Sequence, residues 1–509
     1  MFNFKKFITK YHFYIVPFFW SIISLFSGYH FIKLHYFDYL TNKYDKYGKL
    51  YSVSEGIQLI SAIIAYLFAV IVIFYFYKFI VNVINNNGKE RQILKYSIPI
   101  FLFFIYVLIS RISSVGLTEY YRGDEAVIWD TAAKLYPFMF VYTSEITLIT
   151  FFLCPQIYAP SLIKIIMCSL ILGYTIYNCK KAYNTNLVYL FYIILFLFKN
   201  PLFETILSIH RMHWYSWFYI FFCVKAFFKS IDKDKNNTSS WLEIIFMCFL
   251  CAVLTCLRRE GFYLILTGLI LIIFLYGKIN NQFNLKRSFL IGLTFLLFQS
   301  LVFAPIFSFN FFSEKGTSYN AFMVHMLGSG LDREKSQKEL QIIDKKLDIS
   351  IIDKYNEEMG VLSYADCYYS WSSYKDGKYF AIKNDNSISN DDYYNAIKNV
   401  ILQQPLVFIK SRINAFKSVD KCFDKDKIGL NQASVILLLI LLYAAIKRNF
   451  VLFVLSVGVL LHTIITFMTM PASYIKYFYQ LILFSLFFIT ILLNKKYKNS
   501  DLKFVKKES

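Results

Sequence analysis

A short polar stretch beside an apolar segment holds the side chains best suited to chemistry. Residues 120–126 read Tyr-Tyr-Arg-Gly-Asp-Glu-Ala and carry Arg122, Asp124 and Glu125. Each carboxylate would cost a few kcal/mol in hydrocarbon, so these groups must face water, a cavity or a partner. A carboxylate held in this way can take a proton from a hydroxyl group. We therefore predict a site at this stretch.

Three further charged groups also lie at the ends of apolar segments. They are His210, Arg211 and His213; Arg258, Arg259 and Glu260; and Tyr474, Lys476 and Tyr477. The order of helices given below places all of them on the outer face of a membrane, together with Asp124. Fixed cations stabilise charge that grows on a leaving phosphate, while a carboxylate activates an acceptor hydroxyl. These residue types favour transfer from a donor whose leaving group is a phosphate.

Each group also has a purely structural interpretation. The two adjacent carboxylates could cap a helix that begins at Asp124, because negative charge favours a helix N-terminus. The group around Arg211 could extend to the outer headgroups, and Arg258 could form an ordinary ion pair with Glu260. Asp130 is expected to be a solvated helix residue. The sequence alone leaves these interpretations open.

Metal binding is only weakly indicated. His210 and His213 lack a third ligand, so a zinc site is not predicted. A divalent cation, Mg or Mn, stays open, because the adjacent carboxylates would need a further oxygen ligand from Asp130 or Glu145.

The composition is that of a polytopic membrane protein. Of 509 residues, 57% are hydrophobic and 20% aromatic, and the mean hydropathy is +0.46. The net charge of +21 does not indicate nucleic-acid binding, because Lys and Arg are spread over short loops between apolar runs. Cys248 and Cys251 are expected to be buried thiols within one such run. A disulfide between Cys367 and Cys422 in the polar region is left open.

Apolar runs of about 17 to 25 residues are long enough to cross the hydrocarbon core as helices. We predict twelve, at residues 12–31, 56–78, 97–116, 160–178, 185–199, 214–229, 241–257, 261–277, 288–308, 429–446, 449–469 and 474–493. Placing the basic loops inside makes both termini cytoplasmic. The apolar run 138–153 is expected to stay at the outer surface as a re-entrant or interfacial helix, because crossing would put Lys180 and Lys181 outside.

The runs divide the chain into four parts. These are an N-terminal transmembrane module at 1–308 with an outer acidic loop at 117–159, an extracytoplasmic domain at 309–428, C-terminal transmembrane helices at 429–494 and a basic cytoplasmic tail at 495–509. Within the outer domain, Asp332–Leu347 and Asp391–Lys417 show helical spacing, the second interrupted by Pro405. An aromatic patch between Tyr364 and Tyr374 is expected to be core. The expected fold is an all-α polytopic membrane protein of about twelve transmembrane helices, with a mainly α outer domain between the ninth and tenth.

Three short motifs resemble a known family. Gly123-Asp124-Glu125-Ala126 after an early helix, and Arg258-Arg259-Glu260-Gly261 at the head of a later one, are similar to the GT-C superfamily of membrane glycosyltransferases. The nearest group holds protein O-mannosyltransferases and the bacterial aminoarabinose transferase. The stretch 471–477 is similar to the Arg-Tyr signature these proteins carry before their last helices. The chain departs from the pattern at Lys476, where Arg is usual, and at Arg259, where Pro is common.

The resemblance implies an enzyme that moves a sugar from a polyprenyl-phosphate carrier, usually with inversion, to an extracytoplasmic glycan, lipid or protein. The implied partners are this carrier, membrane lipids and the acceptor, without nucleic acid, and the implied location is the bacterial inner membrane. Asp124 would be the catalytic carboxylate, with Glu125 beside it. The implied phosphate contacts are Arg211, Arg258, Lys476 and Tyr474, supported by Arg122, Glu260 and His210.

Two other functions stay open as alternatives. A flippase or transporter of lipid-linked saccharides would carry charge through the depth of several helices, usually with internal repeats. An O-antigen or capsule polymerase would show a large outer loop rich in Arg. In this sequence the charges gather at outer helix ends and the outer region is charge-balanced. A glycosyltransferase is therefore the favoured prediction, and neither the sugar nor the acceptor is encoded in a visible motif.

Overall fold

The structure is a computed structural model that divides into two compact units. It describes residues 4–35, 55–85, 88–116, 124–135, 142–197, 205–232, 240–279, 282–308, 315–359, 383, 387–419, 430–470 and 475–505. The first unit comprises Met1–Ile306, Lys447–Leu455 and Leu486–Ser509, and the second comprises Phe307–Ile446 and Ser456–Ser485. Within the described ranges the fold is all-α, as predicted, apart from one antiparallel pair of two-residue strands, β1 (Lys278–Ile279) and β2 (Gln282–Phe283).

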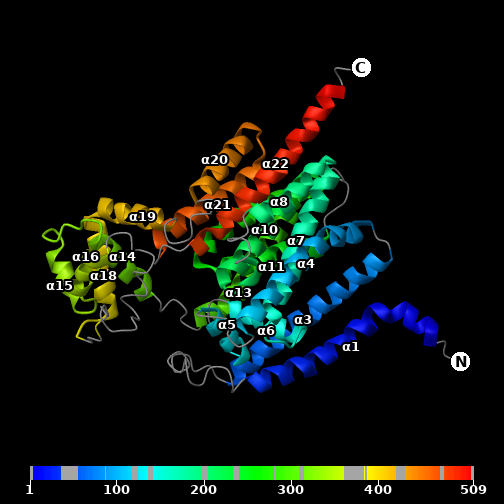
Figure 1. The fold of residues 1–509 in the computed structure, drawn as a ribbon, viewed down its shortest axis with the longest axis horizontal. Helices are drawn as coiled ribbons and strands as arrows, with labels where there is room; N and C mark the ends of the chain where they lie inside the picture. Colours follow the sequence, from blue (N-terminus) through cyan, green and yellow to red (C-terminus); the bar gives the residue numbers. More distant parts are fainter. Residues whose placement is uncertain are drawn as a thin grey trace. The chain divides into compact units, whose positions relative to one another are not determined.

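The chain order of the helices can be followed in Figure 1. Up to residue 308 they are α1 (Phe4–His35), α3 (Glu55–Ile84), α4 (Gly88–Val115), α5 (Asp124–Ala133), α6 (Thr143–Leu153), α7 (Ala159–Tyr183), η1 (Asn186–Tyr189), α8 (Leu190–Leu197), α10 (Arg211–Ile231), α11 (Trp241–Leu257), η2 (Arg259–Tyr263), α12 (Leu264–Tyr276) and α13 (Leu285–Ser308). They continue with α14 (Lys315–Leu327), α15 (Gln337–Asp344), α16 (Ile349–Met359), α18 (Asn390–Gln403), α19 (Pro405–Val419), α20 (Leu430–Ile446), α21 (Phe450–Thr469), η5 (Ile475–Phe478) and α22 (Tyr479–Val505).

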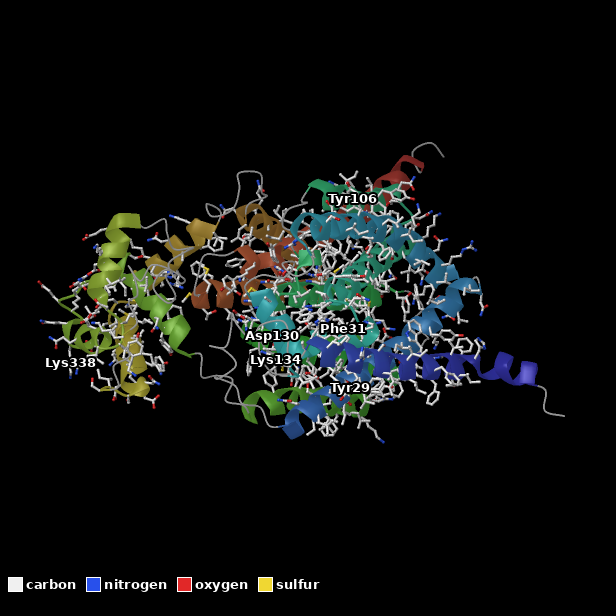
Figure 2. All side chains as sticks on the ribbon, turned by 60° about the horizontal axis from the view of Figure 1, so that its bottom comes forward. Tyr29, Phe31, Tyr106, Asp130, Lys134 and Lys338 are labelled. Carbon is white, nitrogen blue, oxygen red and sulfur yellow. The ribbon has the colours of Figure 1, made fainter. Side chains whose placement is uncertain are left out.

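Seven of the described helices are long and apolar enough to cross a membrane. Their apolar segments are His12–His35, Gln58–Ile84, Gly88–Ser114, Ala159–Tyr183, Leu285–Phe303, Phe450–Thr469 and Ile475–Lys496. Tyr29 and Tyr106, labelled in Figure 2, are 63% and 70% exposed, whereas Phe31 on the same helix as Tyr29 is buried. Large apolar side chains that remain outside a packed core suit a lipid environment. The chain is thus an integral, multi-pass membrane protein.

The remaining predicted spans correspond to other helices of the described chain. They fall on η1 with α8, on α10, on α11, on η2 with α12, and on α20. Of these, α11, α20 and the segment Glu260–Tyr276 are apolar but have fewer than 18 residues. The total of twelve crossings therefore stays a prediction.

Helix α6 packs against α1, α3 and α5 within the first unit. It has 11 residues, roughly 16 Å of helix, which is half of a hydrocarbon core. This length agrees with the prediction that the run 138–153 does not cross. Its polar side chains are buried and bonded: Ser61 on α3 donates to Glu145 Oε2 at 2.8 Å, and the hydroxyls of Thr131 and Ser144 lie 2.8 Å apart.

The contact between α4 and α7 depends on a glycine. A Cβ atom at Gly173 would lie 2.6 Å from the carbonyl oxygen of Ile93, too close for any ordinary contact. The two helices can therefore approach each other only because residue 173 has no side chain.

Helices α14, α15, α16, α18 and α19 share a hydrophobic core in the second unit. Its most buried members include Met323, Val324, Ile343, Leu347, Ile397 and Val400. The prediction of helical structure within Asp332–Leu347 corresponds to α15, and the run Asp391–Lys417 forms α18 and α19, which meet at Pro405 as predicted. The aromatic patch at 364–374 and both Cys367 and Cys422 lie outside the described residues.

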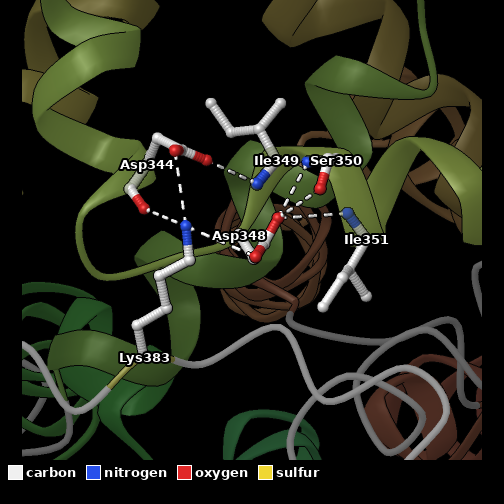
Figure 3. Close-up of polar contacts among 6 residues, drawn as sticks. All are labelled: Asp344, Asp348, Ile349, Ser350, Ile351 and Lys383. Atoms are coloured by element: carbon white, nitrogen blue, oxygen red, sulfur yellow. Dashed lines mark hydrogen bonds and ion pairs between the residues drawn. The ribbon is translucent and has the colours of Figure 1, made fainter.

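A polar network closes the turn between α15 and α16 (Figure 3). Asp348 caps α16 by accepting from the backbone N–H groups of Ser350 and Ile351 at 3.1 and 3.2 Å. The Lys383 ammonium lies 3.3 Å from carboxylate oxygens of both Asp344 and Asp348. The network thus ties the segment at 383 to the start of α16.

One buried cation connects three parts of the second unit. Arg412 on α19 is fully buried and donates from Nη1 to the Met470 carbonyl, directly after α21, at 2.8 Å. Its Nη2 is hydrogen-bonded to Nδ1 of His325 on α14. The rings of Phe322 and Phe408 lie 5.0 and 5.6 Å from the guanidinium carbon. The pKa of His325 lies well below its usual value, mainly because the ring is buried and secondly because the positive charge of Arg412 is close.

Candidate functional site

Glu125 on α5 contacts a backbone corner formed by Leu207, Ser208 and Ile209, which directly precedes α10. Its Oε1 accepts a hydrogen bond from the Ile209 N–H at 3.0 Å, and its carboxylate is hydrogen-bonded to the side chain of Ser208. The carboxylate is partly buried. Asp124, the residue before Glu125, is the first residue of α5.

Lys164 on the second turn of α7 contacts the same corner. Its ammonium is fully buried, donates to the Ser208 carbonyl and lies 5.1 Å from the centre of the Trp214 ring. One turn earlier, the Ser161 hydroxyl donates to the Leu207 carbonyl at 2.7 Å. Two side chains of α7 thus donate to the consecutive carbonyl groups of Leu207 and Ser208. These carbonyl groups are not paired within a helix and need such donors.

The corner leads directly into α10 through His210. The His210 Nδ1 accepts from the Met212 N–H at 3.3 Å and so caps the helix. Its own N–H donates to the Ser208 hydroxyl at 3.3 Å. His210 and His213 are each 5% exposed, with ring centroids 5.8 Å apart, so the alternative that they extend to the headgroups is wrong for both. Arg211, the first residue of α10, is partly buried.

Arg258 and Glu260 form a two-point ion pair where α11 ends. The Arg258 Nε lies 3.0 Å from Glu260 Oε2, and its Nη2 lies 2.7 Å from Oε1. This fork geometry fixes the guanidinium plane more strictly than a single contact could. The Arg258 side chain is only 2% exposed. Arg258 is therefore buried, whereas the Glu260 side chain is 18% exposed.

The ion pair lies beside the first turns of α10. Arg258 and Glu260 both interact electrostatically with Tyr215, whose hydroxyl is 3.1 Å from that of Tyr263 on η2. A Cβ atom at Gly261 would lie 3.4 Å from the Tyr215 ring, which shows how closely η2 approaches α10. Since Tyr215 follows Arg211 by one helical turn, the two charged clusters meet the same end of α10.

Opposing effects act on the carboxylates of α5. Burial raises the pKa of Glu125, and this is countered by the Ser208 hydrogen bond, the charges of Arg111 and Lys164, and the Ile209 N–H. Burial also raises the pKa of Asp130, countered by Lys134, whose ammonium lies 3.1 Å away. Asp130 is only 8% exposed, so the prediction of a solvated residue is wrong.

The other predicted residues lie in the second unit or outside the described side chains. Lys476 lies on η5 in the second unit and is partly buried. Arg122 and Tyr474 lie outside the described residues, as do the side chains of Asp124 and Arg259. Among the side chains that the structure describes, no three His, Cys, Asp or Glu come close enough together to hold a metal ion.

Lys164 and Ser208 are the site residues that sequence reasoning missed. Lys164 interrupts an apolar run of the type that crosses membranes, and an ionisable residue in such a run is by default a functional candidate. That signal was present in the sequence. Ser208 gives no comparable signal, because a serine before a helix is common and only the fold brings it to Glu125.

Comparison of the chain with protein-family models, with curated proteins and with solved structures gave no match to any of them.

Proposed function

We propose that this protein is a membrane glycosyltransferase that moves a sugar from a polyprenyl-phosphate donor to an acceptor outside the membrane. The observation that supports the proposal is the gathering of ionisable side chains at one end of α10. Glu125 comes from α5, Lys164 from α7, and the Arg258–Glu260 pair from the junction of α11 and η2. Transfer with a phosphate leaving group requires a carboxylate that takes the proton of the acceptor and fixed cations that stabilise the leaving phosphate. The start of α5 and the cations around α10 supply these residue types.

The proposed topology has twelve crossings, with both termini in the cytoplasm of a bacterial cell and the polar part of the second unit outside. The basic loops between apolar segments support this orientation. In it, the starts of α5, α7 and α10 and the end of α11 face outward. The charges of the site then lie at helix ends, where a lipid phosphate group is held, rather than through the depth of the bundle, which a flippase would favour.

In the proposed reaction, an acceptor hydroxyl oxygen attacks the anomeric carbon of the donor sugar. The bond between that carbon and the phosphate oxygen breaks, and the lipid phosphate leaves with the electron pair. Asp124 takes the hydroxyl proton as general base, and attack opposite the leaving group inverts the anomeric configuration. Arg211 and Arg258 would stabilise the leaving phosphate, with Glu260 orienting Arg258.

Asp124→Asn tests the role of the carboxylate. Asparagine keeps the shape of the side chain but cannot serve as a base. The assay follows consumption of polyprenyl-phosphate sugar and glycosylation of surface polymers in membranes that carry equal amounts of each chain. Asp232→Asn is the matched control, because Asp232 directly follows the opposite end of α10 in an exposed pair with Lys181.

We expect Asp124→Asn to abolish transfer while Asp232→Asn retains it. Persisting transfer in Asp124→Asn would assign Asp124 to helix capping and remove the proposed mechanism. If no sugar transfer depends on the wild-type chain, while lipid-linked saccharide still moves across the membrane only in its presence, the transport alternative replaces the proposal.

A further inference from the structure

The corner before α10 is held from two sides. Within the first unit, Leu207, Ser208 and Ile209 offer two carbonyls, a hydroxyl and an N–H. Ser161 and Lys164 of α7 bind the two carbonyls, and Glu125 of α5 binds the other two groups. Each of these contacts is made either to a backbone group of the corner or to the Ser208 side chain. Together, the side chains of Ser161, Lys164 and Glu125 therefore hold the corner in place.

The two ionisable members depend on each other. A lysine ammonium that is fully removed from solvent needs compensation, which the Ser208 carbonyl, the Trp214 ring and the charge of Glu125 provide. Glu125 is likewise stabilised by the charge of Lys164. Removing either side chain therefore takes away one hold on the corner and also removes a nearby opposite charge from the other.

The corner is connected to the start of α10 by hydrogen bonds. Ser208 accepts from the His210 N–H at 3.3 Å, and His210 caps the helix whose first residue is Arg211. The path from Lys164 and Glu125 to Arg211 therefore runs through one serine and one capping histidine. An exposed loop without these contacts would let the start of α10 move.

We propose that Lys164 and Glu125 form a positioning latch: together they fix the Leu207–Ile209 corner and so set the place from which α10 presents His210 and Arg211. This assigns Glu125 a different task from that of its neighbour Asp124, since its carboxylate is engaged with the backbone. The consequence for donor binding rests on the proposed function. The latch itself does not.

Hydrogen exchange tests the latch without any activity assay. Peptides covering 205–213 would be followed by mass spectrometry in the full-length, detergent-purified protein, for wild type, Lys164→Met, Glu125→Ala and the double variant. Each single variant should raise amide exchange in this segment at least tenfold, and the double variant should exceed either single by no more than about twofold, because both members hold one corner.

Lys225→Met is the matched control. Lys225 lies on α10, nearer its other end, and also pairs with a carboxylate, Glu243, at 2.8 Å. It should leave the exchange of 205–213 unchanged. The latch is overturned if Lys164→Met exchanges like wild type there, or if exchange rises equally over 219–231, which would indicate general loosening.

Milder variants keep the test decisive where Lys164→Met or Glu125→Ala fails to accumulate. Lys164→Arg keeps the charge, and Glu125→Gln keeps an acceptor for Ile209 but loses the charge. We expect Lys164→Arg to stay near wild type and Glu125→Gln to exchange several-fold faster. Equal exchange in wild type and Glu125→Gln would contradict the dependence of the two members on each other.

The activity arm separates the latch from the proposed function. In Lys164→Met, kcat/KM for the polyprenyl-phosphate sugar should fall at least tenfold, mostly through KM, whereas Lys225→Met should match wild type. If the wild-type chain transfers no sugar but exchange changes as expected, the latch stands and the proposed function fails. If transfer and KM are unaffected in Lys164→Met, the latch does not serve the donor site.

Discussion

Replacing Arg412 by methionine should destabilise the second unit substantially. Arg412 is fully buried and donates to the Met470 carbonyl and to His325. Hydrogen bonds from a charged donor contribute about 1.5 to 3 kcal/mol each. The two aromatic rings beside the guanidinium add about 0.5 to 1 kcal/mol each. Methionine fills similar volume and avoids the cost of burying a charge, which offsets part of this loss. We expect a net decrease of about 3 kcal/mol in the free energy of unfolding.

The assay is denaturant-induced unfolding of the full-length protein in detergent, followed by protease cleavage within 315–419. Arg333→Met in the same unit is the control, because the Arg333 side chain is 52% exposed in its pair with Asp353. Such surface pairs contribute about 0 to 1 kcal/mol. The reasoning about Arg412 fails if its replacement destabilises the protein no more than Arg333→Met does.

Two further predictions concern packing and pH. Gly173→Ala should destabilise the first unit by about 1 to 3 kcal/mol, because its Cβ would lie 2.6 Å from the Ile93 carbonyl, whereas Gly292→Ala, with nothing within 4 Å, should be neutral or slightly stabilising. Unfolding curves of the two variants check this, and equal midpoints would contradict the close helix contact. The pKa of His325 in the folded protein lies well below its unfolded value of about 6.5. The unfolded state therefore binds a proton at a higher pH than the folded state does. As the pH falls below about 6.5, the free energy of unfolding should decrease by up to about 1.4 kcal/mol per pH unit. His325→Gln should reduce this slope between pH 6.5 and 5.5, and an unchanged slope would assign the effect to other groups.

The apolar segments were predictable because burial in lipid leaves a long, uninterrupted signal. The run 241–257 coincides with α11, and the break at Pro405 separates α18 from α19 as predicted, because proline has no N–H for a continuous helix. Lys164 and Arg412 show the limit of this reasoning. Each is a single cation in a run of residues whose average polarity decides the prediction. Its role depends on a partner more than 40 residues away in the sequence, Ser208 for Lys164 and Met470 for Arg412.

The candidate site was predictable in part. The helix start at Asp124 and the pairing of Arg258 with Glu260 follow from local sequence, since the residues involved are neighbours. The contact between Glu125 and Ile209 does not, because it joins residues 84 positions apart. Asp130 was misjudged for the same reason: a lone carboxylate on a short helix suggests solvent, and only the packing of α5 buries it beside Lys134.

Helix α6 also constrains how the chain can be assembled during synthesis. It is too short to cross the bilayer and carries Glu145 with four buried hydroxyl residues, Thr143, Ser144, Thr147 and Thr150. Thr147 and Thr150 donate to carbonyls of α6 itself, but Glu145 and Ser144 would lack Ser61 and Thr131 if α6 were released alone into lipid. The helices that pack against α6, namely α1, α3 and α5, precede it in the chain and leave the ribosome first. The order of synthesis therefore supplies the protein surface on which α6 folds, so that insertion and folding need not be separate steps for this segment.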